Sequence, residues 1–307
     1  MRKWIRIIVI TLLLAGGIVL CAIRWQAWFG MPAEPKWTGD TLRYILPEPA
    51  PSEEGQVTAL VLGDIHSRFS RTEYDLLAAR VPDAQLVMQT GDWMDRGQYY
   101  YFQLLLREWT ASKLCGLPVI ACPGNHEYSK GLPRRLSPLW DETFMHPLNG
   151  PEGVPGASHW LDIAHARVIV IDTNPLDRLM YLTRTLTWLR QTMYDADGRF
   201  IIVLMHHPVL STAKGRFNTL IYTAFRRALG DADLVLAGHD HGYMRRAPFV
   251  VLNAAGTPKP QRTIENADVA DSVFVYGVLT LDSAALDLRI HRFDDGTVLD
   301  SLHVIHD

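Results

Sequence analysis

The chain has 307 residues, of which 48% are hydrophobic and 21% are charged, and its formal net charge is −3. This hydrophobic content is enough for a large buried core, and the length allows one large domain or two small ones. The small negative charge excludes a general electrostatic attraction to nucleic acid or anionic lipid, so local groups would have to attract an anionic substrate.

The N-terminal 30 residues are predicted to form a membrane anchor. Three basic residues precede an uncharged apolar run over residues 7–23, which is close to the minimum of about 17 residues for a membrane span. Positive charge before the run favours a cytoplasmic N-terminus, so a single-pass protein would expose the rest of the chain outside the cytoplasmic membrane. A cleaved secretory signal is the alternative, although Leu20-Cys21-Ala22 is a poor cleavage site. Residues 31–56, rich in proline and acidic residues, are interpreted as a tether.

From residue 57 to residue 307, the sequence predicts one domain in which strands and helices alternate. Short apolar runs predict buried strands at residues 57–62, 86–89, 117–121, 159–163, 167–172, 200–205 and 234–237. Helical spacing predicts helices at residues 98–114, 182–193 and 217–229, and another helix that Thr72 would cap. Near the C-terminus, alternating runs at residues 273–281, 285–293 and 298–305 predict strands of a second sheet. This alternation is typical of a layered α/β domain.

Two features between these elements are open to more than one interpretation. Residues 128–158 are long for a connection and rich in proline and glycine, so they form either a lid or substrate-selecting loop, or a solvated insertion. Cys115 and Cys122 flank the third predicted strand. They form either a disulfide or, as we favour, two buried thiols, because a disulfide requires a geometry that sequence alone does not provide.

Five short polar clusters follow predicted strands. They are Gly63-Asp64-Ile65-His66, Gly91-Asp92-Trp93-Met94-Asp95-Arg96, Gly124-Asn125-His126-Glu127, Met205-His206-His207-Pro208 and Gly238-His239-Asp240-His241. Open α/β sheets bind ligands at the carboxyl ends of their strands, so we expect the five clusters to meet. Singly, an aspartate or asparagine in such a place would be interpreted as a turn or helix-cap residue. Five clusters in this order favour a functional site.

Side-chain alternation along extended segments gives two further expectations. His239 and His241 are separated by one residue, so they would point the same way and offer two nitrogen ligands from one segment. His206 and His207 are adjacent, so His207 would point away from His206 and take a packing or supporting role.

With these clusters the chain resembles the calcineurin-like metallophosphoesterase superfamily, whose motifs run D-x-H, GD-x-x-D, GNH(D/E), H and GH-x-H in that order. The resemblance covers about residues 57–245 and implies a four-layer α-β-β-α sandwich. The segment from Thr185 through His206 to Tyr243 looks most similar to the purple acid phosphatase branch, and Gly238-His239-Asp240-His241 resembles the phosphodiesterase and acid phosphatase branches. Purple acid phosphatases, however, have a metal-binding tyrosine where this chain has Asp95, so their Fe(III)-tyrosinate chemistry is not implied.

The resemblance also implies a centre of two metal ions bridged by Asp92. One ion would be held by Asp64, His66, Asp92 and His241, and the other by Asp92, Asn125, His206 and His239. Mixed oxygen and nitrogen ligands without cysteine suit Mn, Fe or Zn. His126 would protonate the leaving group or bind a phosphoryl oxygen, Asp95 would orient His126 through its carboxylate, and Arg96 would contact the phosphate.

Such a centre would hydrolyse phosphate monoesters or diesters, with a hydroxide activated by the metal ions attacking phosphorus in line. With the anchor, the catalytic domain at residues 57–307 would work outside the membrane, where a lipid-linked phosphate ester is a candidate substrate. Three alternatives stay open: a Ser/Thr phosphoprotein phosphatase, whose motifs resemble the second and third clusters; a membrane-bound scaffold without activity; and a nuclease. The net charge and the lack of a basic stripe argue against a nuclease, so no nucleic-acid partner is expected.

Overall fold

The computed structural model describes residues 11, 13–17, 55–130, 134–212 and 219–305. Within this part of the chain, no helix has both the length and the apolar character that a membrane span requires. The predicted anchor and tether lie almost entirely outside the described residues. The division into anchor, tether and catalytic domain therefore stays a prediction.

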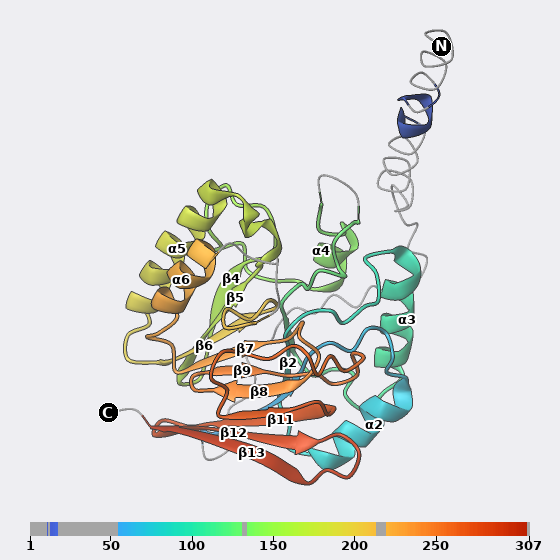
Figure 1. The fold of residues 1–307 in the computed structure, drawn as a ribbon. Coiled ribbons are helices and arrows are strands. Elements are labelled where there is room, and N and C mark those ends of the chain that lie inside the picture. Colours follow the sequence, from blue (N-terminus) through green and yellow to red (C-terminus); the bar gives the residue numbers. More distant parts are fainter. Residues whose placement is uncertain (1–10, 12, 18–54, 131–133, 213–218, 306–307) are drawn as a thin grey trace.

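Two β-sheets lie face to face at the centre of the described part of the chain (Figure 1). The first sheet has the order β13-β12-β11-β1-β2-β3, and the second has the order β10-β8-β9-β7-β6-β5-β4. The strands of the first sheet are β1 (Val57–Leu62), β2 (Leu86–Gln89), β3 (Val119–Ala121), β11 (Val275–Leu281), β12 (Ala285–Arg292) and β13 (Val298–Ile305). Those of the second are β4 (His159–Ile163), β5 (Ala166–Ile171), β6 (Phe200–Met205), β7 (Leu234–Ala237), β8 (Tyr243–Arg246), β9 (Phe249–Val251) and β10 (Val269–Asp271).

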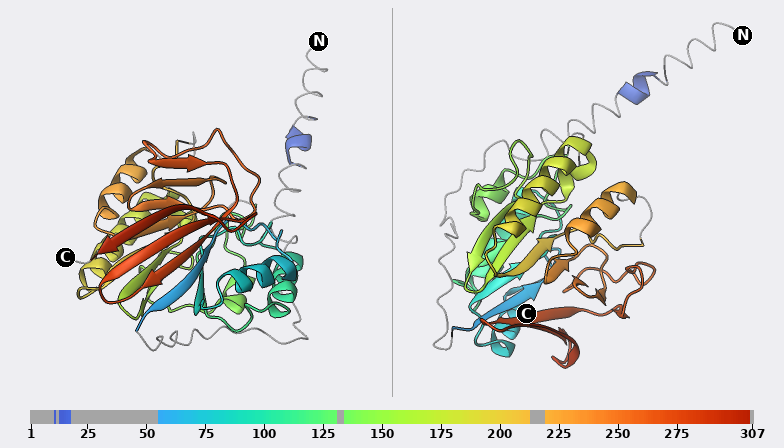
Figure 2. Two further views of the ribbon diagram at one scale, coloured as in Figure 1. Left: turned by 90° about the horizontal axis from the view of Figure 1, so that it is seen from below. Right: turned by 90° about the vertical axis from the view of Figure 1, so that its left-hand side faces the viewer.

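Helices cover the outer faces of the two sheets (Figures 1 and 2). On the first sheet pack α2 (Arg71–Arg80) and α3 (Tyr99–Thr110), and on the second pack α5 (Leu179–Tyr194) and α6 (Thr219–Ala228). The sandwich also contains the short helix α4 (Leu139–Thr143) and the 3-10 turn η1 (Asn174–Asp177). The order helix, sheet, sheet, helix confirms the predicted α/β sandwich.

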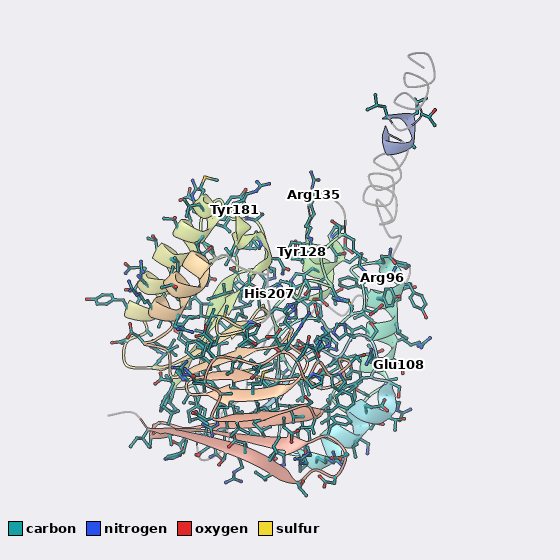
Figure 3. All side chains as sticks on the ribbon, in the orientation of Figure 1. Arg96, Glu108, Tyr128, Arg135, Tyr181 and His207 are labelled. Carbon is teal, nitrogen blue, oxygen red and sulfur yellow. The ribbon has the colours of Figure 1, made fainter. Side chains whose placement is uncertain are left out.

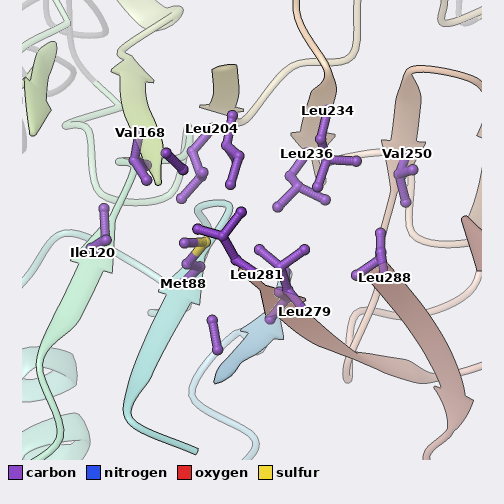
Figure 4. Close-up of a cluster of buried hydrophobic side chains, with 14 of the residues drawn as sticks. Met88, Ile120, Val168, Leu204, Leu234, Leu236, Val250, Leu279, Leu281 and Leu288 are labelled. Carbon is purple, nitrogen blue, oxygen red and sulfur yellow. The ribbon is translucent and has the colours of Figure 1, made fainter. Parts of the chain in front are cut away.

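The contact between the sheets is a layer of buried aliphatic side chains (Figure 4). Met88 and Leu281 of the first sheet pack in one cluster with Val168, Leu204 and Leu236 of the second, and none of the five is more than 4% exposed. Each such side chain contributes about 1.5–3 kcal/mol by leaving water. This layer holds the sheets in one relation and therefore fixes the relative positions of the loops at their edge.

Ser70, and not Thr72, caps the first helix of the domain. The Ser70 hydroxyl accepts a hydrogen bond from the backbone N–H of Thr72 at 3.2 Å, and the Glu73 carboxylate accepts one from the backbone N–H of Ser70 at 2.8 Å. Such a capping box contributes about 1 kcal/mol. Thr72 lies inside the first turn, because Glu73 three residues after Ser70 completes the pair.

The C-terminal strands extend the first sheet and do not form a second one. β11 pairs antiparallel with β1, with Thr58 opposite Thr280, and β12 and β13 follow outward from β11. The second sheet is built from residues 159–271 instead. The strands themselves were predicted, but their assignment to a second sheet was wrong. Periodicity predicts the conformation of a segment and not the strand with which it pairs.

The long connection at residues 128–158 is tied at both ends to Asp172, which follows β5. The Tyr128 hydroxyl donates to the Asp172 carboxylate at 2.5 Å, and the backbone N–H of Ala157 donates to the same oxygen at 3.2 Å. Between them, Trp140 on α4 is 1% exposed. The described parts of this connection are packed against the domain, while a role as a lid or substrate-selecting loop stays a prediction.

Neither Cys115 nor Cys122 forms a disulfide. The favoured interpretation of two buried thiols is confirmed for Cys122 and wrong for Cys115, which is a free but exposed thiol. Burial raises the pKa of the Cys122 thiol well above its ordinary value, so this side chain is neutral and serves packing.

Candidate metal centre

The five polar clusters meet at one edge of the paired sheets. The parallel strands β1, β2 and β3 of the first sheet, and β5, β6 and β7 of the second, all end there. The predicted ligands occupy the loops that follow β1, β2, β3, β6 and β7: Asp64 and His66, Asp92, Asn125, His206, and His239 and His241, respectively. In Figure 3, His207 marks the middle of this edge and Arg96 lies toward α3.

Four side chains make up what we call the first metal position: Asp64, His66, Asp92 and His241. All four are buried, and their ligand atoms lie within 4.8 Å of one another. Asp64 Oδ1 lies 3.4 Å from His241 Nε2 and 3.6 Å from His66 Nε2. The two Nε2 atoms of His66 and His241 are 3.1 Å apart. The structure thus brings together the side chains that the resemblance assigns to one ion.

The second metal position is formed by Asp92, Asn125, His206 and His239. His206 Nε2 lies 3.3 Å from Asp92 Oδ2, 3.3 Å from Asn125 Oδ1 and 3.0 Å from His239 Nδ1. The same Asp92 oxygen is 3.7 Å from His66 Nε2 of the first position. Asp92 therefore lies between the two positions, where a bridging carboxylate would have to be.

Hydrogen bonds on the far side of two imidazoles show that the site fits a cation. His206 Nδ1 lies 3.0 Å from the carbonyl of Thr90, and His241 Nδ1 lies 2.9 Å from the carbonyl of Thr257. A ring N–H donated to each carbonyl directs Nε2 toward carboxylate oxygen, so that the neutral ring would offer its Nε2 lone pair to an ion held there. Asp64 Oδ1 is buried and accepts no hydrogen bond within the described part of the chain. Lone pairs converging in a buried space are stabilised by a positive ion between them.

The electrostatics follow from burying two carboxylates among imidazoles. Burial alone would raise the pKa of Asp64, but the neighbouring imidazoles of His241 and His66 hold it at about 2. Burial also opposes ionisation of Asp92, yet the positive charge of His206 takes its pKa well below the usual range. In return, the charge of Asp92 outweighs burial and raises the pKa of His206 to about 9. The carboxylates are thus ionised at neutral pH and require positive charge beside them, as a metal ion would provide.

The backbone at the predicted ligands is strained. Positive φ angles occur at Asp64 (51°), His66 (53°), Asp92 (52°), His239 (73°) and His241 (53°). This region is unfavourable for residues with a side chain, and such strain gathers at functional sites. The segment of His239 and His241 is therefore not extended as predicted, and the two imidazoles serve different positions.

Glycines before the ligands allow the loops to approach each other. A Cβ atom on Gly124 would lie 2.2 Å from Asp92 Oδ1, and one on Gly238 would lie 2.4 Å from Asp64 Oδ2. Both distances are far below van der Waals contact, so a side chain at either position would displace a predicted ligand. The backbone N–H of His239, next to Gly238, donates to Asp64 Oδ2 at 2.6 Å.

Glu127 is the last residue of the third cluster, and no role was predicted for it. Its fully buried carboxylate accepts hydrogen bonds from the backbone N–H groups of Asp92 (3.0 Å), Met94 (3.0 Å) and Gly124 (2.6 Å). Burial and the nearby charge of Asp92 raise its pKa to about 7. Glu127 therefore fastens the second cluster to the third. Its position directly after His126 was the feature of the sequence that could have indicated a role in the site.

His126 lies beside the first metal position, but the Asp95 carboxylate does not orient it as predicted. His126 Nδ1 lies 2.5 Å from the backbone carbonyl of Asp95 and 3.9 Å from its carboxylate. Its Nε2 faces Asp92 Oδ2 at 3.9 Å. A ring N–H donated to the carbonyl sets the orientation, because the turn after Asp92 places that backbone group closer than the side chain.

Asp95 and Arg96 lie at the rim of the centre. The Asp95 side chain is 44% exposed and that of Arg96 is 51% exposed, with 3.9 Å between their charged atoms, which makes a weak surface pair. A carboxylate oxygen of Asp95 still lies within 4.8 Å of ligand nitrogens of His66 and His126. A phosphate contact by Arg96 stays a prediction.

His207 does not point away from the site as predicted. β6 ends at Met205 and the next two residues form a bend, so strand alternation stops before His206. The ring centroid of His207 is 4.9 Å from that of His206 and 4.4 Å from that of His239. Ligand nitrogens of these three imidazoles lie within 4.8 Å of one another.

Sequence comparison decides the family. A family model described as calcineurin-like phosphoesterase matches residues 57–243. The chain belongs to the calcineurin-like phosphoesterase family. The match contains all seven predicted ligands and His126, and it covers more than half of the 307 residues. A search of curated protein sequences finds no match.

Solved structures share the fold of this chain at low sequence identity. GAP50, the anchor in the inner membrane complex of Plasmodium, has a TM-score of 0.58 at 14% identity, covering 82% of this chain and 89% of GAP50. Purple acid phosphatase PPD1 from yellow lupin has a TM-score of 0.59 at 16% identity, covering 85% and 55% of the two chains. PhoD has a TM-score of 0.55 at 13% identity, covering 82% and 70%. At these identities the likeness shows the fold alone.

The family and the geometry together support a metal-dependent hydrolase of phosphoric esters. Calcineurin-like phosphoesterases use divalent metal ions, and the buried Asp and His side chains at both metal positions are able to hold them. Carboxylate, amide and imidazole donors suit Mn, Fe and Zn alike.

Proposed function

We propose that this protein hydrolyses phosphate monoesters or diesters at a centre of two metal ions. One observation carries the proposal: the seven predicted ligands, drawn from five separate loops, form two adjoining clusters that share Asp92. Structural aspartates and asparagines at strand ends have no reason to converge in this way. We assign Asp64, His66, Asp92 and His241 to the first ion and Asp92, Asn125, His206 and His239 to the second.

Bound metal ions would neutralise phosphate oxygens and lower the pKa of an attacking water. The chain's own contribution is orientation and proton handling. His126 is held at Nδ1 by the Asp95 carbonyl, so Nε2 is directed toward Asp92 and the space beside it. Burial lowers the pKa of His126, whereas a bound phosphate anion would raise it and favour a proton on Nε2. From there the proton can pass to the leaving oxygen.

The test is turnover by the purified full-length protein in detergent. Matched aryl phosphate monoesters and diesters are offered with Mn²⁺, and Asp92→Ala serves as the control. We expect one ester class to be cleaved faster and all turnover to vanish in the control. Turnover by Asp92→Ala at the rate of the wild type would contradict the proposal.

We further propose that residues 7–23 attach the protein to the cytoplasmic membrane, with the phosphoesterase domain on the outer side and a lipid-linked phosphate ester as substrate. The apolar run and the basic residues before it support this location. In vesicles, the full-length protein should cleave lipid phosphate esters faster than soluble ones of the same ester class. Equal rates for both would count against a lipid substrate.

A scaffold is the second candidate, because GAP50 has the same fold and is described as an anchor. The described site nevertheless retains every predicted ligand, which a protein without activity has no need to keep. His126→Ala separates the two functions. If the protein is an enzyme, the His126→Ala variant should keep its metal ions but lose both turnover and its activity in the cell. If the protein is a scaffold, the variant should keep its activity in the cell.

A further inference from the structure

We infer that His207 is a third imidazole ligand of the second metal position, which makes that position richer in nitrogen than the first. The inference rests on the proposed function, because it requires the two ions. The family motifs assign Asn125, His206 and His239 to this position and leave His207 without a role. Three observations support adding it.

The first observation is proximity. A ring nitrogen of His207 lies within 4.8 Å of the ligand nitrogens of His206 and His239, and the three rings are in edge or tilted contact. Ligands bound at about 2.0–2.1 Å to one Zn²⁺ lie up to roughly 4 Å apart. A small rotation of a partly exposed ring is enough to reach that separation.

The second observation is the support on the other side of the ring. The Thr173 hydroxyl lies 2.7 Å from His207 Nδ1, and it accepts a hydrogen bond from the backbone N–H of His207 at 3.4 Å. Thr173 is 2% exposed and follows β5, which runs parallel to β6. A ring N–H donated to this hydroxyl would place the ring's lone pair on Nε2. His206 and His241 have the same arrangement with backbone carbonyls, and it is typical of imidazoles that bind metal.

The third observation is accessibility. His207 is half-buried, as is Asn125, whereas His206 and His239 are buried. His207 therefore closes the second position on its solvent side, near the middle of the edge in Figure 3.

The consequence is a difference in metal preference. The first position offers the carboxylates of Asp64 and Asp92 with two imidazoles. The second offers one carboxylate, one amide oxygen and, with His207, three imidazoles. Imidazole suits Zn and other late transition metals, while carboxylate and carbonyl oxygen suit Mn and Mg. The second position should therefore prefer Zn²⁺ over Mn²⁺ more strongly than the first.

Metal titration of the full-length protein tests this without an activity assay. Protein stripped by a chelator is titrated with Zn²⁺ and, separately, Mn²⁺ by calorimetry, and X-ray absorption counts the nitrogen ligands of bound Zn²⁺. In His207→Ala we expect one of two Zn²⁺ affinities to fall by at least about 10- to 100-fold, because removing even a group that supports a ligand costs this much. The other Zn²⁺ site should be unchanged, Mn²⁺ binding should change less, and the nitrogen count should fall.

Matched variants keep the result interpretable. His207→Gln preserves polarity should His207→Ala fold poorly, and it should show the same selective loss. Thr173→Val removes the supporting hydroxyl at nearly constant volume and should weaken the same Zn²⁺ site less. His165→Ala removes an exposed histidine outside the clusters and should change nothing. If both His207 variants bind two Zn²⁺ ions like the wild type, His207 is not a ligand. If the wild type itself binds no pair of ions, the proposed function fails instead.

Discussion

The two sheets contribute different chemistry to the metal centre. Loops of the first sheet provide the oxygen donors, which are Asp64, Asp92 and Asn125, together with the single imidazole of His66. Loops of the second sheet provide imidazoles alone: His206, His239 and His241, with His207 beside them. Neither sheet holds a complete metal position. The centre therefore forms only when the two sheets are packed together. Ions bound there would in turn link the two sheets.

Removing the carboxylate of Asp92, which both metal positions share, should have the largest effect on the centre. Asp92→Asn takes a charge from both positions, whereas Asp64→Asn takes one from the first position only. We expect Asp92→Asn to lose both ions and at least about a thousandfold in turnover, equivalent to roughly 4 kcal/mol. Asp64→Asn should retain one ion. Elemental analysis of the purified variants, with turnover measured in parallel, checks both expectations, and two ions retained by Asp92→Asn would contradict a shared carboxylate.

Removing the ions should weaken the tie between the sheets. Ions at 100 to 1,000 times their Kd stabilise the folded state by about 2.7–4.1 kcal/mol. Treatment with a chelator should therefore lower the melting temperature, and added Mn²⁺ should restore it. Asp92→Ala is the control and should not respond to the chelator. An unchanged melting temperature in the wild type would mean that no ion joins the two sheets.

Replacing Glu127 tests the loops of the first sheet while every predicted ligand stays in the sequence. Glu127→Ala leaves three buried backbone N–H groups without their acceptor, and each such loss costs about 1–3 kcal/mol. We expect the free energy of unfolding in urea to fall by roughly 3 kcal/mol, with a smaller loss in Glu127→Gln, which keeps a carbonyl acceptor. Glu152→Ala, at an exposed position, should be within about 0.5 kcal/mol of the wild type. If Glu127→Ala is as stable as that control, Glu127 does not hold the second and third clusters together.

A polar tie away from the centre offers the mildest test. Asp300 on β13 accepts hydrogen bonds from the Tyr243 hydroxyl and from Arg245 Nε on β8, each at 2.6 Å, and so joins the two sheets. Partial burial acts to raise the pKa of Asp300, but these bonds outweigh it and lower the pKa. Asp300→Asn should lower the free energy of unfolding by about 1–2 kcal/mol at neutral pH.

The pH dependence of that difference has a definite sign. A carboxyl group whose pKa is lowered by folding stabilises the fold above its ordinary pKa of 3.8, and the contribution is lost as pH falls through the folded value. The gap between wild type and Asp300→Asn, measured by urea unfolding, should therefore narrow at acid pH. A gap that stays constant down to acid unfolding would show that the charge of Asp300 is not involved.

Local pattern was sufficient for much of the fold. The strands at residues 57–62, 86–89, 200–205 and 234–237 have the predicted bounds, because a buried strand is a continuous apolar run whose ends are marked by polar residues. The strand at residues 298–305 also has the predicted bounds, and there the signal was the alternation of apolar and polar residues. The helical spacing over residues 98–114 places Phe102 and Trp109 on one face of α3, and both are buried. Helix ends were less accurate: α3 ends at Thr110 and not at residue 114, because the apolar spacing continues into a turn that is no longer helical.

The order and spacing of the five clusters are local properties of the chain, so they were enough to predict which residue types reach the edge of the sheets. How those side chains share the site depends on tertiary packing. The placement of His207 beside His239, the orientation of His126 by the Asp95 carbonyl and the pairing of β11 with β1 all depend on contacts between distant segments. Alternation along a strand also gave the wrong relation between His239 and His241, because both residues have positive φ angles, which packing between the sheets stabilises.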